Sequence, residues 1–411
     1  MAGTAQTWVP EVRQGFGIEH LPYGSFAPPG GDRRLGVRIG DQVLDLRAAA
    51  RARVVPEQCD APDLGRLLAA ATAQRRDVRA AIVDALTDEH RVPALEPLLH
   101  DVGEVTLLLP FRVGDYVDFY SAEAHARNVG AIFRPEQPGL PPNYRHLPIG
   151  YHGRSGTVVV SGTQIVRPAG QWRDADGAVT FGPTRRLDIE LEMGFVLAGA
   201  TRHGHPLPID SAGDHIFGVG LLNDWSARDI QAWESRPLGP LLSKSFATSL
   251  AAWITPIEAL EPYRVPGPEQ NPTPLPHLRT TRPWAFDLNL DVRISSPGMR
   301  GAGQAAAVIT TTNHRELYWN MAQQVAHLTA NGASIAPGDL CASGTISGPE
   351  PGTYGSLLEL TWNGEQPITL PDGSTRTFLD DGDEVVLGGR SPDGVIRLGS
   401  VIGSIAATAD G

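Results

Sequence analysis

Frequent turn residues are the feature that most limits what this chain can fold into. Its 411 residues include 46 glycines and 35 prolines, together about a fifth of the chain against a usual share of about 12%. They lack the triplet repeat of collagen. Because glycine and proline interrupt helices and mark turns, we predict a mainly β protein with some α, built from short strands, and not a helical bundle.

Charge and composition exclude several classes of protein. There are 46 acidic against 34 basic residues, a formal net charge of −12, which disfavours nucleic-acid binding because that binding depends on basic side chains. No run of ~18 apolar residues predicts a membrane span, and the first residues lack the pattern of a signal peptide. The two cysteines, Cys59 and Cys341, are too few for a disulfide framework. We therefore expect a reduced, cytoplasmic protein without nucleic-acid or membrane partners.

Residues 1–110 are predicted to form a separate N-terminal domain. Residues 35–46 have the pattern of a hairpin with a turn at Gly40 and Asp41. Apolar residues recur at helical spacing over residues 78–86 and predict an amphipathic helix. The character of the sequence changes at Pro110, so residues 111–411 are predicted to form a second, larger domain.

The larger domain is predicted to consist mostly of short strands. These strands are 157–161, 187–197, 216–222, 286–294, 357–362 and 384–387. One helix interrupts them, with a start resembling a capping box at Asn313 and Glu316 and an end at Asn331–Gly332. The proline-rich stretch 261–283 is predicted to be a long surface loop.

Acidic side chains in three separate segments are the best candidates for chemistry. The segment LDIELEM places Asp188, Glu190 and Glu192 on one face of a strand. Neighbouring carboxylates repel by ~1 kcal/mol in water at close range, so a solvated strand face and a cation site both remain open. With Asp224 and Asp118 the set would be all oxygen, which favours calcium, magnesium or manganese over zinc. Spacing alone does not show that the acids converge.

Other polar residues indicate little by themselves. His125 is one of 12 histidines, Lys244 could be an ordinary surface lysine, and Glu359 an ordinary strand acid. The residues alone predict a hard-cation site on a β-rich scaffold. A non-catalytic calcium-binding β protein remains an alternative, whereas a dinucleotide-dependent oxidoreductase is disfavoured because no strand–GxGxxG–helix unit is present.

Many long motifs together resemble the fumarylacetoacetase family over nearly the whole chain. They include GDYVDFYSAEAHARNVG from Gly114, LPIGYHGRSGTVVVSGT from Leu147, LDIELEM from Leu187, IFGVGLLNDWSARDIQAWE from Ile216 and GDLCASGTISG from Gly338. The resemblance implies an SH3-like N-terminal barrel at 1–110, a β-rich roll or sandwich at 111–411, and a homodimer built on the latter. It also implies hydrolysis of a carbon–carbon bond in 4-fumarylacetoacetate, giving fumarate and acetoacetate at the end of tyrosine and phenylalanine breakdown.

The resemblance also implies roles for individual residues. Those implied to hold calcium are Asp118, Glu190, Glu192 and Asp224, and magnesium is associated with Asp224, Lys244 and Thr248. The implied general base is His125, oriented by Glu359, and the implied oxyanion-binding groups are Arg228, Gln231 and Lys244. The implied substrate contacts are Tyr120, Arg134, Tyr151, Gln231 and Thr345.

One departure from the family pattern bears on the substrate. Where the family usually has a substrate-binding tyrosine two residues after the tryptophan of IQAWE, this chain has Ser235 followed by Arg236. A short hydroxyl in place of a phenol shortens or removes one contact. A related acylpyruvate or β-diketone acid, hydrolysed by the same mechanism, is therefore the nearest alternative substrate.

Overall fold

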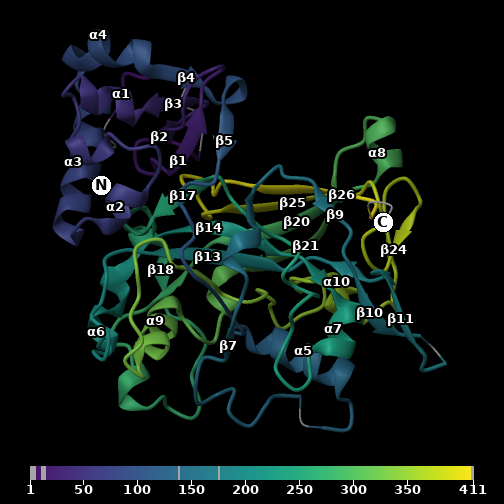
Figure 1. The fold of residues 1–411 in the computed structure, drawn as a ribbon. Helices are drawn as coiled ribbons and strands as arrows, with labels where there is room; N and C mark the ends of the chain where they lie inside the picture. The colour runs from purple at the N-terminus through teal and green to yellow at the C-terminus, as the bar shows by residue number, and fades with distance from the viewer. Residues whose placement is uncertain (1–5, 11–14, 138, 175, 409–411) are drawn as a thin grey trace.

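Two large β-sheets organise the computed structural model, which describes residues 6–10, 15–137, 139–174 and 176–408. One sheet has 13 strands and the other five, and the helices lie at their margins (Figure 1). This confirms the prediction of a mainly β protein with some α. Among the described residues, no helix is both long and apolar enough to cross a membrane.

The N-terminal part is an antiparallel set of strands flanked by helices. Its predicted hairpin is present as β2 (Arg34–Ile39) and β3 (Gln42–Asp45), joined at Gly40, whose φ of 59° favours glycine. The predicted helix lies within α3 (Thr72–Thr87). The other elements are β1 (Tyr23–Ala27), β4 (Leu99–Asp101), β5 (Thr106–Leu108), α1 (Leu46–Arg51), α2 (Gly65–Ala69) and α4 (Val92–Leu95).

The N-terminal strands continue directly into the sheet that carries the acidic residues. Strand β1 pairs with β17 (Trp253–Pro256), and the order then runs β17-β14-β13-β22-β6-β7. Figure 1 labels β1, β17, β14 and β13 of this series. One sheet therefore passes through both parts of the chain. Its remaining strands are β6 (Tyr116–Phe119), β7 (Gly150–His152), β8 (Val158–Val160), β13 (Leu191–Leu197), β14 (Ile216–Asp224), β16 (Thr248–Leu250) and β22 (Leu340–Ala342).

The N-terminal part packs on the face of this sheet that carries acids. Its Leu35 belongs to one hydrophobic cluster with Val196 on β13 and Leu222 on β14. Because side chains alternate along a strand, Val196 shares a face with Glu192, and Leu222 shares that face with Asp224. The apolar core between the two parts therefore lies beside the acidic side chains.

The five-stranded sheet packs against the opposite face. Met193 and Phe195 of β13 form one hydrophobic cluster with Leu290 and Val292 of this second sheet, so the larger domain is a sandwich. Predicted strands 286–294 and 384–387 lie mostly within it. Its strand order is β21 (Ala307–Asn313), β20 (Asn289–Ser295), β25 (Glu384–Arg390), β26 (Val401–Ala406) and β9 (Ile165–Val166).

The predicted strand at 357–362 is wrong, because the chain forms helix α10 (Leu357–Leu360) there. Ser356 is the N-cap of this helix and accepts a hydrogen bond from the Glu359 N–H at 3.4 Å. Serine followed three residues later by glutamate is the pattern of a capping box. The capping hydrogen bond at Ser356 therefore favours a helix here, although the apolar residues of the segment are also compatible with a strand.

The start predicted for the helix after residue 313 is also wrong. Helix α9 (Met321–Thr329) begins later, where Asn320 and Gln323 form the capping box. Asn313 instead caps a single 3₁₀ turn, His314–Glu316. Two capping signals lie seven residues apart, and only the second is followed by a regular helix.

Short elements complete the larger domain. The stretch 261–283, predicted as a loop, holds a 3₁₀ turn (Pro276–Leu278) and a two-residue strand, β18 (Arg264–Val265). The remaining helices are α5 (Glu123–Phe133), α6 (Ile209–Ala212), α7 (Arg228–Glu234) and α8 (Pro297–Gly301). The remaining strands are β10 (Ala169–Arg173), β11 (Val179–Pro183), β12 (Leu187–Asp188), β15 (Ser226–Ala227), β19 (Ala285–Phe286), β23 (Ile368–Thr369) and β24 (Thr375–Arg376).

Candidate metal centre and catalytic site

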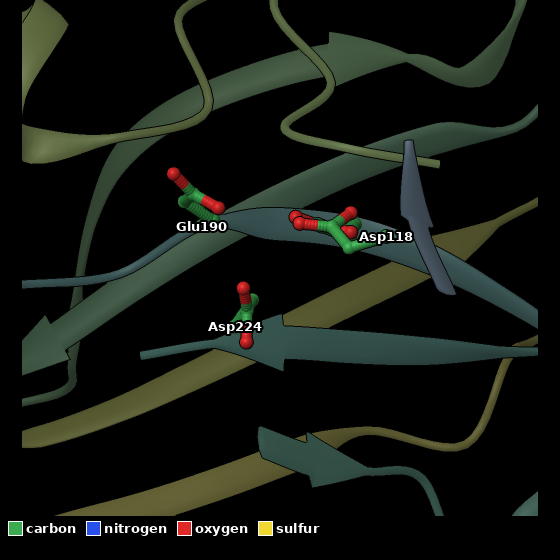
Figure 2. A group of neighbouring side chains, drawn as sticks. Asp118, Glu190 and Asp224 are labelled. Carbon is green, nitrogen blue, oxygen red and sulfur yellow. The ribbon is translucent and has the colours of Figure 1, made fainter. Parts of the chain in front are cut away.

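Four buried carboxylates from three segments of the chain meet beside the 13-stranded sheet. Asp118 lies on β6, Glu192 on β13 and Asp224 at the end of β14, and Glu190 immediately precedes β13. One oxygen from each lies within 4.8 Å of the others, and Figure 2 shows three of them facing a common space. The pairing of β13 with β14, and of β22 with both β13 and β6, brings these segments together.

The cluster has the properties of a site for a hard cation. Asp118 Oδ1 and Glu192 Oε1 are buried and accept no hydrogen bond. Burial, and next the neighbouring carboxylates, raises the pKa of both side chains well above the ordinary value. A divalent cation would remove this penalty, and an all-oxygen donor set is the one that calcium and magnesium prefer. The residues present therefore fit a resident hard cation.

A lysine adjoins the carboxylates. Lys244 Nζ donates to Glu190 Oε2 and, at 2.8 Å, to Asp224 Oδ2. Burial alone would lower the pKa of Lys244, but Asp224 and Glu190 outweigh it and raise that pKa. The protonated ammonium has no lone pair, so this side chain can neutralise charge in the site but cannot ligate a metal. Any direct contact between Lys244 and magnesium would have to use its main-chain carbonyl.

Asp224 has two further hydrogen-bond donors. Thr248 Oγ1 donates to Asp224 Oδ1 at 2.7 Å, because β16 pairs with β14 at this position. Tyr151 OH donates to Asp224 Oδ2 at 3.2 Å from the edge strand β7. The structure therefore places Thr248 and Tyr151, both predicted site residues, against the same carboxylate.

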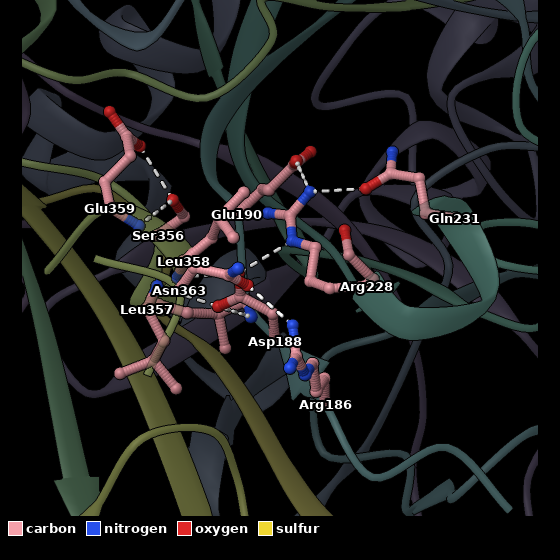
Figure 3. Close-up of polar contacts among 12 residues, drawn as sticks. Arg186, Asp188, Glu190, Arg228, Gln231, Ser356, Leu357, Leu358, Glu359 and Asn363 are labelled. Carbon is pink, nitrogen blue, oxygen red and sulfur yellow. Dashed lines mark hydrogen bonds and ion pairs between the residues drawn. The ribbon is translucent and has the colours of Figure 1, made fainter. Parts of the chain in front are cut away.

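An arginine connects the carboxylate cluster to helix α7. Arg228 Nη1 lies 2.8 Å from Glu190 Oε1 and donates to Gln231 Oε1 at 3.0 Å, while its Nε donates to Asp188 Oδ2 at 2.7 Å (Figure 3). Arg228 Nη2 is buried without a hydrogen-bond partner. The expected grouping of Asp188 with Glu190 and Glu192 is wrong, because the strand is interrupted after Asp188 and this side chain pairs with Arg228.

His125 and Glu359 form a buried dyad. The Nδ1 atom of His125, on α5, lies 2.7 Å from Glu359 Oε2 on α10. Ser356 and Ser347 also donate to Oε2, at 2.7 and 2.9 Å, and Asn128 donates to Oε1 at 2.9 Å. Burial would raise the pKa of Glu359, but His125 and these donors lower it below the ordinary value. Glu359 is therefore ionised at neutral pH and held in one orientation.

Of the other predicted substrate contacts, one lies against the dyad. The Tyr120 ring meets the His125 ring edge-on, with centroids 5.2 Å apart. Thr345 is buried, and its Oγ1 has no hydrogen-bond partner. Arg134 is partly exposed at the end of α5. Ser235 donates its hydroxyl to the main-chain carbonyl four residues earlier, so that hydroxyl is engaged within its own helix.

Three residues of the dyad environment were not predicted. Asn128 lies three residues after His125, a spacing that puts both on one face of a helix. Ser356 precedes Glu359 by three residues, the capping-box spacing. Both signals are present in the sequence. Ser347 comes from a turn-rich segment and has no comparable signal.

Comparison with known proteins identifies the class. The sequence matches the families described as Fumarylacetoacetate (FAA) hydrolase C-terminal over residues 116–407 and Fumarylacetoacetase N-terminal over residues 19–110. The chain therefore belongs to the metal-dependent fumarylacetoacetate hydrolase class, and its buried acidic cluster could bind a metal. Fumarylacetoacetase from Homo sapiens is 44% identical over 397 residues, covering 93% of this chain and 94% of that protein. The enzyme from Arabidopsis thaliana is 42% identical, covering 91% of each. The chain belongs to the fumarylacetoacetase family.

Solved structures with the same fold are more distant. Maleylpyruvate hydrolase from Sphingobium sp. SYK-6 matches with a TM-score of 0.53 at 18% identity, covering 94% of this chain and 100% of that one. A fumarylacetoacetate hydrolase from Exiguobacterium antarcticum matches with a TM-score of 0.54 at 14% identity, covering 94% and 99%. At these identities the likeness establishes the fold alone.

Proposed function

We propose that this protein hydrolyses 4-fumarylacetoacetate to fumarate and acetoacetate, the last step of tyrosine and phenylalanine breakdown. The observation that carries the proposal is a buried histidine–glutamate dyad together with a four-carboxylate cluster, with His125 near enough to act electrostatically on Glu190. The high identity to fumarylacetoacetases over more than nine-tenths of the chain supports the same substrate. A non-catalytic calcium-binding protein would need the cation site but gives no reason for the dyad.

His125 is proposed as the general base. Neutral imidazole can take a proton from water near pH 7, and Glu359 fixes its tautomer and stabilises the imidazolium that results. The hydroxide adds to the carbonyl carbon on the fumaryl side of the diketone, and the carbon–carbon bond to the acetoacetate portion then breaks. The proton held by His125 returns to the departing carbon, and the new carboxyl group releases its own proton to solvent as fumarate, so atoms and charge balance.

Calcium is proposed as the resident cation of the cluster, held by Asp118, Glu190, Glu192 and Asp224. When bound, the cation supplies a Lewis acid for the diketone oxygens. We further propose magnesium near Asp224 and Thr248, next to Lys244. Four carboxylates with two buried cationic side chains nearby leave a net charge of −2, which one divalent cation such as calcium balances.

The groups proposed to stabilise the oxyanion adjoin the carboxylate cluster: Arg228 and Lys244 contact Glu190, and Gln231 contacts Arg228. Arg228, Gln231 and Lys244 present cationic or amide N–H groups, and losing one such donor typically costs 10²–10³ in rate. Tyr120, Arg134, Tyr151 and Thr345 are proposed to contact the substrate, together with Gln231. The free Oγ1 of Thr345 and the free Nη2 of Arg228 support these roles, because a bound substrate could supply their missing partners.

A steady-state assay of metal-loaded and chelator-stripped protein tests the function. Turnover is followed as loss of the diketone absorbance of fumarylacetoacetate, with fumarylpyruvate and shorter diketones in parallel. We expect metal-dependent turnover that is fastest on fumarylacetoacetate. A clear preference for another acylpyruvate would favour the alternative that Ser235 suggests, and absence of turnover on every diketone would reject the hydrolase.

We also propose that the protein works as a homodimer in the cytoplasm. The family resemblance supports both statements. Light scattering coupled to size-exclusion chromatography measures the mass in solution, and a monomer mass of 43.9 kDa would contradict the dimer. Fractionation of cells that express the tagged protein checks the compartment.

A further inference from the structure

Asp188 is a fully buried acid to which the proposed mechanism assigns no role. Its exposed fraction is 0%, and its two oxygens accept four hydrogen bonds. Oδ1 accepts from the N–H groups of Ile189 and Leu357, both at 2.7 Å. Oδ2 accepts from the N–H of Leu358 at 3.0 Å and from Arg228 Nε at 2.7 Å (Figure 3). The carboxylate therefore joins three different segments of the chain.

Two of those segments carry proposed catalytic groups. Leu357 and Leu358 are the first two residues of α10, and Glu359 follows directly. Arg228 is the first residue of α7, and its Nη1 atom lies against Glu190. One carboxylate thus contacts both the helix of the base dyad and the arginine proposed for the oxyanion.

Neither segment can hold this geometry by itself. Helix α10 has only four residues, and a helix that short is unstable without external contacts. The guanidinium of Arg228 stands on a long flexible side chain; Glu190 and Gln231 hold its Nη1 end, and the bond from Nε to Asp188 is the second restraint that fixes its plane. Asp188 supplies the anchor in both cases.

We infer that Asp188 is a positioning residue that holds Glu359 and Arg228 at a fixed separation, and so aligns the base with the oxyanion-binding group. The inference rests on the proposed function. It differs from a purely structural role, in which Asp188 would only balance the buried charge of Arg228. A structural role predicts a loss of stability with kcat unchanged in the folded enzyme.

Asp188→Asn tests the inference. The amide has the same shape, but in either orientation its NH₂ faces two of the four donors that now meet an oxygen. We expect kcat to fall by roughly 10–100-fold, the effect of a misplacement near 1 Å. The cation content should stay at the wild-type value, because Asp188 contacts none of the four carboxylates of the cluster. A folded variant with wild-type kcat would overturn the inference.

Asp383→Asn is the matched control. Asp383 is also fully buried and accepts from an arginine, Arg376, at 2.7 and 2.9 Å, and from the Asp380 N–H at 3.0 Å. These partners lie on β24 and the turn before β25, outside the site. We expect a lower Tm with kcat unchanged at temperatures well below Tm. An equal fall in kcat for this control would overturn the inference, because it would mean that any buried aspartate–arginine pair has the same effect.

A charge-neutral pair serves if Asp188→Asn does not fold. Asp188→Asn combined with Arg228→Gln removes one buried negative and one buried positive charge together, so the net buried charge is unchanged, and it is compared with Arg228→Gln alone. The anchor of α10 is lost only in the double variant. We therefore expect kcat of the double variant to be several-fold lower than that of Arg228→Gln. We also expect a shift in the part of its pH–rate profile that reports the titration of the general base. Identical kcat and pH profiles would overturn the link to Glu359. Failure of the proposed function is distinguishable, because it would appear as absent turnover in the wild-type enzyme.

Discussion

Replacing Glu359 by glutamine removes one negative charge from the dyad and changes little else in the surrounding packing. The Ser347 and Ser356 hydroxyls can rotate to accept a hydrogen bond, and the Asn128 amide can turn over to present its oxygen. Because the side chain keeps its shape, we expect the free energy of unfolding to fall by about 1–3 kcal/mol at most.

The effect on catalysis should be larger. In the transition state His125 gains a positive charge, and the carboxylate whose Oε2 lies 2.7 Å from Nδ1 stabilises it. Unit charges ~4 Å apart interact by ~4 kcal/mol at an effective dielectric constant of ~20, which corresponds to about 10³ in rate. Glutamine also weakens the selection of the imidazole tautomer. We therefore expect kcat to fall by about 10³-fold.

The assay is steady-state hydrolysis with the cation saturating, together with Tm and metal content. Metal content should not change, because Glu359 contacts none of the four carboxylates of the cluster. Glu365→Gln, at an exposed position in the turn after α10, controls for the loss of one acidic charge and should retain wild-type kcat. If Glu359→Gln folds normally and keeps kcat within tenfold of wild type, the dyad does not act as described.

Three other perturbations have effects that the structure predicts. Chelation of the resident cation should lower Tm. If the free cation had been at 100 times its Kd, the loss in the free energy of unfolding is ~2.7 kcal/mol. An unchanged Tm after chelation would contradict a buried cation site. Lys244→Met should lower kcat by 10²–10³ and tighten cation binding, since it removes ~1 kcal/mol or more of repulsion; weaker binding by calorimetry would show that Lys244 supports the site differently. Burial lowers the pKa of His20 from 6.5 to about 3. Below pH 6.5 the unfolded chain therefore binds a proton at this histidine that the folded protein does not bind. The free energy of unfolding should fall as the pH falls from 6.5 toward 3, by up to about 5 kcal/mol. Urea unfolding at several pH values measures this loss, and His20→Gln should flatten the dependence; an equally steep dependence in that variant would assign the loss to other groups.

The sequence was sufficient for the fold class and for the identity of the acids, but not for their arrangement. LDIELEM predicts alternate faces only if it is a single strand. The chain departs from that geometry between Asp188 and Glu190, so Asp188 goes to Arg228 while Glu190 and Glu192 go to the cluster. That break depends on pairing with β14 and β15, which are distant in sequence, and no local pattern reports it.

At α10 the sequence contains a signal for a helix start, but the strand prediction followed the weaker apolar pattern. Ser356 and Glu359 have the spacing of a capping box, yet the apolar run around them indicated a strand. The hydrogen bonds at a helix start are specific, whereas a short apolar run is compatible with either structure. Asn128 likewise follows from helical spacing once His125 is placed on a helix. Partners such as Ser347 require the tertiary fold.

The single sheet that passes through both parts of the chain determines how the protein can come apart. A chain that began after residue 110 would leave the β17 edge without β1 and would expose the apolar side chains of Leu222 and Leu250 to water. An unpaired edge beside an apolar surface invites self-association. The N-terminal part is therefore a fixed component of the sheet that carries the acidic cluster, and the two parts of the chain should unfold together in one cooperative transition.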